Sequence, residues 1–187
     1  MTNRCLLQVA LLLCFSMTAL SMSDDLLQFR LRSSSLECQN LLWQLNASLE
    51  DCLKNRMNFG IPEEIKQPQQ FQNMDTTLVI YKMLQKIFDI FTRDFSSTGW
   101  NETIVENFLA NVYQQIDRLE TIVGEKLKKK DIPTGYTVRL MRLNSYYFRI
   151  VGYLKAKEYS SCAWTIVRQE LLKNFFFINR LSDYLQI

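Results

Sequence analysis

The amino-acid sequence predicts an all-α protein in which five helices pack into one bundle. Apolar residues recur at helical spacing in five separate segments, and this periodicity is the main signal for helix. Only five glycines and three prolines occur among 187 residues, which disfavours a turn-rich sandwich or barrel. Because 48% of the residues are hydrophobic and 12% are aromatic, the chain has enough apolar surface for a single core.

The N-terminal segment, residues 1–21, has the features of a secretory signal peptide. A basic n-region precedes an apolar run over residues 5–20, and small residues stand where a signal peptidase prefers them. The run contains polar interruptions and is shorter than the roughly 20 residues of a membrane span. We therefore expect cleavage before Met22, secretion without membrane insertion, and a single mature domain over residues 22–187.

The first helix is expected over about residues 24–45. Asp24 and Asp25 suit the positive end of the helix dipole. Three serines at residues 33–35 interrupt its apolar stripe. The stripe consists of Leu27, Leu31, Cys38, Leu41, Leu42 and Leu45.

A long connection follows, over about residues 46–73. Pro62 and Pro68 prevent a regular helix there. Connections of this length are uncommon inside compact domains, and a long overhand crossover lets two consecutive helices run parallel.

Four further helices are expected after this connection. The second covers about residues 74–92, and the third covers about residues 100–129 with lysines near its C-terminal end. Apolar residues from Leu140 to Leu154 mark the fourth. The fifth, at about residues 161–185, is apolar beyond one stripe, as expected for a helix that packs on several neighbours.

The mature domain would contain three cysteines, Cys38, Cys52 and Cys162. In an oxidising compartment an odd number predicts one disulfide and one leftover thiol. Spacing alone allows three pairings. A Cys38–Cys52 bridge would close a short loop, whereas a Cys52–Cys162 bridge would close about 110 residues and contribute roughly 4–5 kcal/mol in the chain-entropy description. Cys38 would then be a small buried residue or a reactive thiol.

Two sequons, at Asn46 and Asn101, are candidates for N-glycosylation in an exported protein. Asn101 is the stronger candidate because its sequon ends in threonine. An unmodified residue at a helix end is the alternative for Asn46.

The composition excludes most catalytic chemistry. The chain has no histidine, so Ser-His-Asp triads, Cys-His pairs and HExxH zinc helices are excluded. Neither a metal site nor a cofactor is expected. The net charge of +3 is too small to indicate a nucleic-acid-binding protein. A binding function is favoured over an enzymatic one.

One mixed surface stands out on the last helix. It is formed by Arg168, Gln169, Leu172 and Lys173, which are expected to lie mostly away from the apolar core stripe of that helix. Arginine together with apolar side chains is typical of interface anchors. With a Cys52–Cys162 bridge, Leu53 and Arg56 would lie near this surface. A plain solvated face is the alternative.

Five segments resemble the type I interferon family. They are LWQL at residues 42–45, CLKNRMNF at 52–59, IPEEI at 61–65, TGWNETIVEN at 98–107 and YLKAKEYSSCAWTIVR at 153–168. The resemblance covers nearly the whole chain. It implies a five-helix long-chain cytokine bundle, up-up-down-down with long crossover loops, and a Cys52–Cys162 disulfide with Cys38 as the free thiol.

The resemblance also implies a mechanism. A secreted monomer would bridge the two different chains of the heterodimeric type I interferon receptor, activating Janus kinases and STAT factors and inducing an antiviral, antiproliferative state. Its tight-binding face would comprise Trp43, Leu53, Arg56, Arg168, Leu172 and Lys173, and its weaker face Phe88, Ile104, Tyr113 and Arg149. The chain departs from the family pattern at Asn144, usually basic, at Gln169, commonly apolar, and at Lys173, usually arginine.

Three other functions compete with this interpretation. Another secreted helical cytokine would share the bundle but bind a different receptor. A membrane-active amphipathic protein would need a more cationic face than this charge allows. A secreted enzyme is the least favoured, because no nucleophile or metal cluster converges.

Overall fold

A computed structural model describes residues 25–45, 48–67, 69, 73–128 and 135–185. Four long helices follow the first helix, which spans residues 25–44. They are α3 (Asn73–Phe91), α4 (Glu102–Lys128), α5 (Tyr136–Ala156) and α6 (Ser161–Ser182). The described residues contain no strand, so the prediction of an all-α bundle is confirmed. The predicted signal peptide lies outside the described residues.

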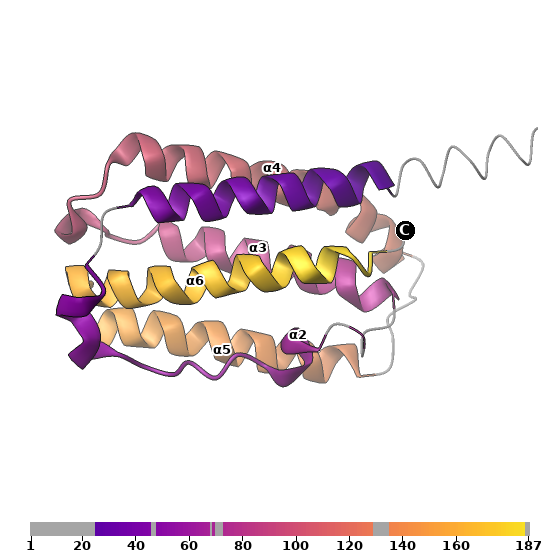
Figure 1. Cartoon of the computed structure of the whole chain (residues 1–187). Helices are drawn as coiled ribbons and strands as arrows, with labels where there is room; N and C mark the ends of the chain where they lie inside the picture. Colours follow the sequence, from indigo (N-terminus) through magenta and orange to yellow (C-terminus); the bar gives the residue numbers. More distant parts are fainter. Residues whose placement is uncertain (1–24, 46–47, 68, 70–72, 129–134, 186–187) are drawn as a thin grey trace, which may run out of the picture.

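The helix directions follow from contacts near the helix ends. Gln28 donates a hydrogen bond to the Ser182 carbonyl (2.9 Å), and Arg168 donates one to the Leu42 carbonyl (2.8 Å), so the first helix and α6 are antiparallel. Asp94, just after α3, accepts a bond from the Trp164 indole at the start of α6. The first helix and α3 therefore run parallel, and α4 and α6 run the opposite way (Figure 1). This is the predicted up-up-down-down order, with α5 between α4 and α6 in the chain.

Where the structure describes the long crossover, it contains two short helices that the sequence does not predict, η1 (Glu50–Asn55) and α2 (Glu63–Lys66). Between them the chain runs along α5 (Figure 1). The Arg149 side chain donates to the carbonyls of Phe59 (2.8 Å) and Gly60 (2.9 Å), and the Tyr153 hydroxyl donates to Asn55 O (2.7 Å). These bonds fasten the crossover to α5.

Aromatic rings fill the end of the core where α3 meets α6. Phe91 lies 4.5 Å from Phe108 and 5.7 Å from Trp164 between ring centroids, and Trp100 also packs on Trp164. Phe175 continues the cluster through Phe108. These five rings are all buried, so they form one aromatic cluster that joins α3, α4 and α6.

The disulfide joins Cys52 to Cys162, as predicted, with a Cα–Cα distance of 5.1 Å. It ties η1 to the first turn of α6. Cys38 is a free, buried thiol, and burial raises its pKa to about 12. Of the two expected alternatives for Cys38, the structure shows the buried residue.

The serine interruption does not break the first helix, which is continuous from residue 25 to residue 44. Ser35 is buried, and its hydroxyl donates to the Gln115 side chain of α4 (3.4 Å). The sequence pattern placed Ser35 outside the apolar core stripe. Its hydroxyl can nevertheless be buried, because a polar side chain on the neighbouring helix accepts its hydrogen bond.

We expect Phe91→Ala to lower the free energy of unfolding by about 3–5 kcal/mol, because it leaves a cavity among three aromatic rings. Chemical denaturation would measure the loss. The control is Phe148→Ala, since the Phe148 ring is 77% exposed and its removal should change stability by no more than about 0.5 kcal/mol. Equal losses in the two variants would contradict this description of the core.

Candidate functional site

The six residues proposed as a tight-binding face, here called the Trp43 face, come from the first helix, the η1 segment and α6. Trp43, Leu53, Arg56 and Lys173 are exposed. Arg168 and Leu172 are buried, so the expectation that they lie on the surface is wrong. Arg168 is four residues from Trp164 and three from Leu171, which places it on the core side of the helix.

Arg168 instead supports Trp43 from beneath. The residue is 3% exposed, and its guanidinium donates from Nη1 to the Leu42 carbonyl and lies 5.7 Å from the Trp43 ring centroid. Burial lowers its pKa. The Trp43 side chain is 63% exposed above it. A cation–π contact therefore holds a large aromatic ring at the surface, ready to contact a partner.

The disulfide positions the other part of the Trp43 face. Leu53 follows Cys52 directly, and Arg56 follows η1, so the bridge to Cys162 holds both exposed residues near the first turn of α6. Three segments thus supply the residues of the Trp43 face, and two of these residues, Arg168 and Leu172, lie below the surface.

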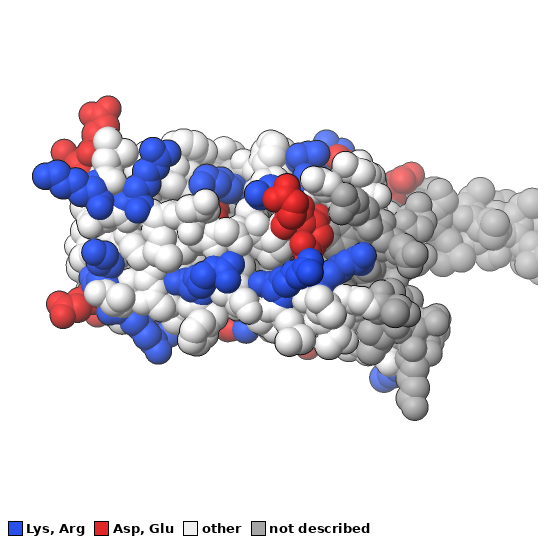
Figure 2. Space-filling model, turned by 90° about the horizontal axis from the view of Figure 1, so that it is seen from below, with Lys and Arg blue, Asp and Glu red and all other residues white. Residues whose placement is uncertain are grey.

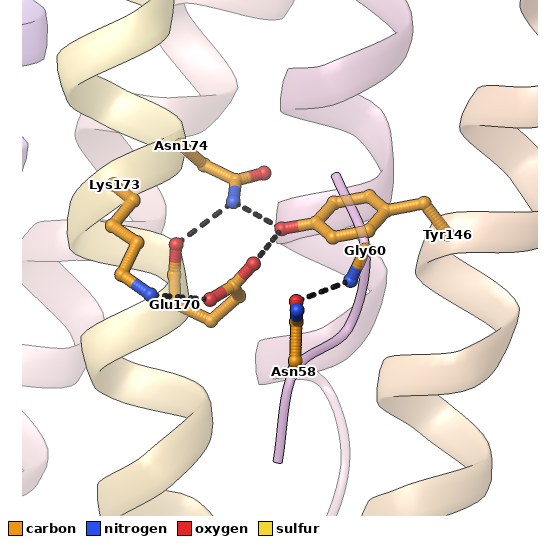
Figure 3. A network of polar contacts seen from close by, with 6 residues as sticks. All are labelled: Asn58, Gly60, Tyr146, Glu170, Lys173 and Asn174. Atoms are coloured by element: carbon orange, nitrogen blue, oxygen red, sulfur yellow. Dashed lines mark hydrogen bonds and ion pairs between the residues drawn. The ribbon is translucent and has the colours of Figure 1, made fainter. Parts of the chain in front are cut away.

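A buried polar network lies behind Lys173 (Figure 3). The Tyr146 hydroxyl donates to Glu170 Oε1 (2.9 Å), and Asn174 Nδ2 donates to the Tyr146 oxygen (2.6 Å). Tyr147 donates to Asn174 Oδ1 (2.5 Å). The second carboxylate oxygen, Glu170 Oε2, accepts a hydrogen bond from Lys173 Nζ (3.0 Å). The buried network therefore holds the ammonium group of an exposed lysine in position.

Sequence reasoning missed this network. The available signal was a pair of polar residues, Glu170 and Asn174, four apart on an otherwise apolar helix, facing two consecutive tyrosines in α5. Burial, the largest cause, raises the pKa of both Tyr146 and Tyr147 well above the ordinary value.

The four residues proposed as a weaker face, here called the Tyr113 face, do not all lie together. Phe88 of α3 and Tyr113 of α4 have ring centroids 6.3 Å apart and line one hollow with Lys82 and Lys86. Tyr113 is exposed. This pair gives the face an aromatic centre.

Arg149 lies in a hollow that adjoins the first one through Lys86, Asp89 and Asn144. The second hollow is lined by one acidic residue, Asp89, and by four basic residues. The basic residues are Lys86, Arg93, Arg149 and Lys155. Figure 2 shows basic side chains along the underside of the bundle, where α5 lies. The Tyr113 face is therefore basic, although Asn144 is uncharged.

Ile104 stands apart from that face. It lies nine residues before Tyr113 in α4, which is about half a turn around the helix. Gln115 and Arg118 contact the first helix, and Ile104 is on their side of α4 by the same helical geometry. The structure thus separates Ile104 from the Phe88–Tyr113 pair.

Asn101 is exposed and caps α4. Its Oδ1 accepts hydrogen bonds from the backbone of Thr103 (2.9 Å) and Ile104 (3.4 Å). Capping uses the oxygen, which leaves Nδ2 for a glycan. The other sequon residue, Asn46, lies outside the described residues.

Among the described residues, no cluster of histidine, cysteine, aspartate or glutamate could hold a metal ion. None of the helices in the same part of the chain combines the length and apolar character needed to cross a bilayer.

Comparisons with known proteins agree with the architecture. The interferon alpha/beta domain profile matches residues 27–185. The chain is 69% identical to interferon beta of Macaca fascicularis and 67% identical to that of Homo sapiens, in each case over the full length of both chains. The solved structure of zebrafish interferon 2 has a TM-score of 0.69 and 25% identity, and the match covers 80% of this chain and 97% of that one.

The buried tyrosines predict a loss of stability in alkali. Below about pH 10, the ordinary tyrosine pKa, the phenols are protonated in both states and their contribution is complete. Above it the unfolded chain releases protons that the folded chain retains, so the free energy of unfolding should fall as pH rises toward the folded pKa.

Tyr147→Phe should make this alkaline decline shallower. Denaturant titrations at a series of pH values would measure the slope, and tyrosinate absorbance would show whether ionisation coincides with unfolding. Parallel curves for the wild type and Tyr147→Phe would contradict the assignment.

Proposed function

The chain belongs to the interferon alpha/beta family, and we propose that it acts by bridging the two different chains of the type I interferon receptor. It is a type I interferon cytokine and not an enzyme, so its function rests on binding surfaces. Bridging would bring receptor-associated Janus kinases together, activate STAT factors and induce an antiviral, antiproliferative state.

The observation that carries the proposal is the existence of two candidate faces on different elements. The Trp43 face uses the first helix, the η1 segment and α6. The centre of the Tyr113 face uses α3, α4 and α5. Because the faces share no residue and no element, two receptor chains could bind at the same time.

The Trp43 face has the features of a high-affinity contact. Tryptophan and arginine are enriched among residues that dominate binding energy, and a preorganised side chain loses little entropy on binding. Trp43 is exposed yet held by Arg168, and Lys173 is held by Glu170. We assign the tighter receptor chain to this face.

The Tyr113 face suits a weaker contact. Its aromatic pair lies in a shallow hollow surrounded by cations, and rim charges contribute more to association rate and specificity than to affinity. The complementary receptor surface would be acidic. We place Phe88, Tyr113 and Arg149 in this contact, with Ile104 acting through helix packing.

Secretion and glycosylation complete the proposal. Cleavage after residue 21 would release the mature domain, and a glycan on Asn101 would project from the N-terminus of α4. The Cys38 thiol is buried between the first helix and α4, where Gln115 contacts it, so it should stay reduced in the folded protein.

Alanine at Trp43, Arg56 or Arg168 should weaken binding to the tighter receptor chain, with a loss of about 2 kcal/mol, or roughly thirtyfold, for Trp43→Ala. The effects of Trp43→Ala and Arg168→Ala should not add, because Arg168 acts through the Trp43 ring. Surface plasmon resonance would measure the affinities, and circular dichroism would check helix content.

The matched control for this series is Phe148→Ala, which removes an exposed ring on α5, a helix that contributes no residue to the Trp43 face, and should leave the affinity unchanged. Additive losses for Trp43 and Arg168 would show that Arg168 contacts the receptor independently. Unchanged affinity in Trp43→Ala and Arg56→Ala would reject the placement of the face.

Tyr113→Ala should lower signalling in a reporter cell without changing affinity for the tighter chain, by an amount that corresponds to about 1–2 kcal/mol of weaker-chain binding. The control is Gln114→Ala, the exposed neighbour on the outward side of α4. If Tyr113→Ala signals like the wild type, the Tyr113 face is not a receptor contact.

A further inference from the structure

The outward side of the first helix carries large apolar side chains that nothing in the described structure covers. Leu26 and Leu36 are each 50% exposed, and Phe29 is 69% exposed. Together with Trp43 they form a row on the side opposite the buried stripe. Exposed apolar rows of this kind mark interaction surfaces.

The spacing along this row is that of a coiled-coil seam. Residues three and four apart alternate over almost three heptads, with two polar positions in the row. We call the row the first-helix seam, and it consists of Leu26, Phe29, Ser33, Leu36, Asn40 and Trp43.

We propose that the first-helix seam pairs with the same seam of a second copy of this chain, with the two helices parallel and in register. In this arrangement each side chain meets its own copy. The polar residues Ser33 and Asn40 face polar residues, and Phe29, Leu36 and Trp43 form apolar layers. An asparagine at such a seam position favours a parallel, in-register pair.

Charges beside the seam complement each other in the parallel pair. In a parallel pair, a residue that flanks the seam on one helix faces the residue five positions later in the other helix. Arg32 would therefore face Glu37 of the second copy, and Asp25 would face Arg30 of the second copy. Arg30 and Glu37 are exposed and make no ion pair with any described residue. Arg32 already contacts Asp183 of its own chain at 2.8 Å, which holds it in place.

An antiparallel pair would be less favourable. It would place Asn40 of one copy against Phe29 of the other and Ser33 against Leu36, so polar groups would be buried beside apolar ones. The sequence of the seam therefore distinguishes the two orientations.

The pair should be weak. Four half-exposed side chains bury on the order of a few hundred Å² per copy, below the roughly 800 Å² per partner of a stable interface. Dissociation constants in the micromolar range or above follow from this size. The protein would be a monomer at the concentrations of a circulating signal and would pair where it is concentrated.

Pairing would also affect receptor binding, a consequence that rests on the proposed function. Trp43 belongs both to the first-helix seam and to the Trp43 face. A second copy on the seam would cover that ring, so a paired molecule should not bind the tighter receptor chain.

Sedimentation velocity of the glycosylated mature protein, from below one micromolar to about a hundred micromolar, tests the pairing directly. The weight-average mass should rise toward twice the monomer mass. Phe29→Gln combined with Leu36→Gln should keep the protein monomeric over this range, whereas Phe148→Gln, an equally exposed change on α5, should pair like the wild type. A monomer at every concentration, or equal pairing in all three proteins, would overturn the proposal.

Charge reversal tests the orientation. Arg30→Glu should weaken pairing by placing two carboxylates in contact, and adding Asp25→Arg should restore it, because the swapped charges again attract in a parallel pair. Failure of the second change to restore pairing would overturn the parallel arrangement.

Adding the isolated ectodomain of the tighter receptor chain separates this inference from the proposed function. The ectodomain should dissociate the pair, with free monomer converted to a one-to-one complex. If the protein pairs but binds no receptor chain, the first-helix seam stands and the proposed function fails. If the ectodomain binds the intact pair, the seam does not cover Trp43.

Discussion

The central position of α6 is the constraint on which the rest of the structure depends. The helix is buried on most of its circumference, so the polar side chains that it buries need hydrogen-bond partners inside the protein. Arg168 bonds to Leu42 of the first helix, and Glu170 and Asn174 bond to tyrosines of α5. These contacts fix how both neighbours sit against α6. They also place Trp43 and Lys173 at the surface, so the polar interior of α6 organises the candidate binding face.

Much of the fold could be predicted from the sequence, because long amphipathic stripes and a long proline-containing connection leave few alternatives. The five helices, the crossover and the Cys52–Cys162 bridge all agree with expectation. The short helices η1 and α2 could not be predicted, since long-range bonds such as that from Arg149 to the crossover hold the segment in place. Local pattern carries no information about those contacts.

The candidate site was harder to predict than the fold. Helical spacing already placed Arg168 beside Trp164, but a charged side chain was expected at the surface, and only a backbone carbonyl on another helix makes its burial tolerable. Likewise, nine residues of α4 separate Ile104 from Tyr113 by half a turn, which the family resemblance did not reveal. The family resemblance indicates candidate binding residues. The structure then distinguishes the exposed ones, which can contact a partner, from the buried ones, which hold the exposed side chains in position.

The central claim is that two separate faces bind two receptor chains at once, and sequential binding of the isolated ectodomains tests it most directly. The tighter chain would be captured on a surface, saturated with the glycosylated protein, and then exposed to the weaker chain in surface plasmon resonance. We expect a further response with one-to-one-to-one stoichiometry, because the Trp43 and Tyr113 faces share no residue. Competition between the two ectodomains for the protein, with no ternary complex at any concentration, would contradict it.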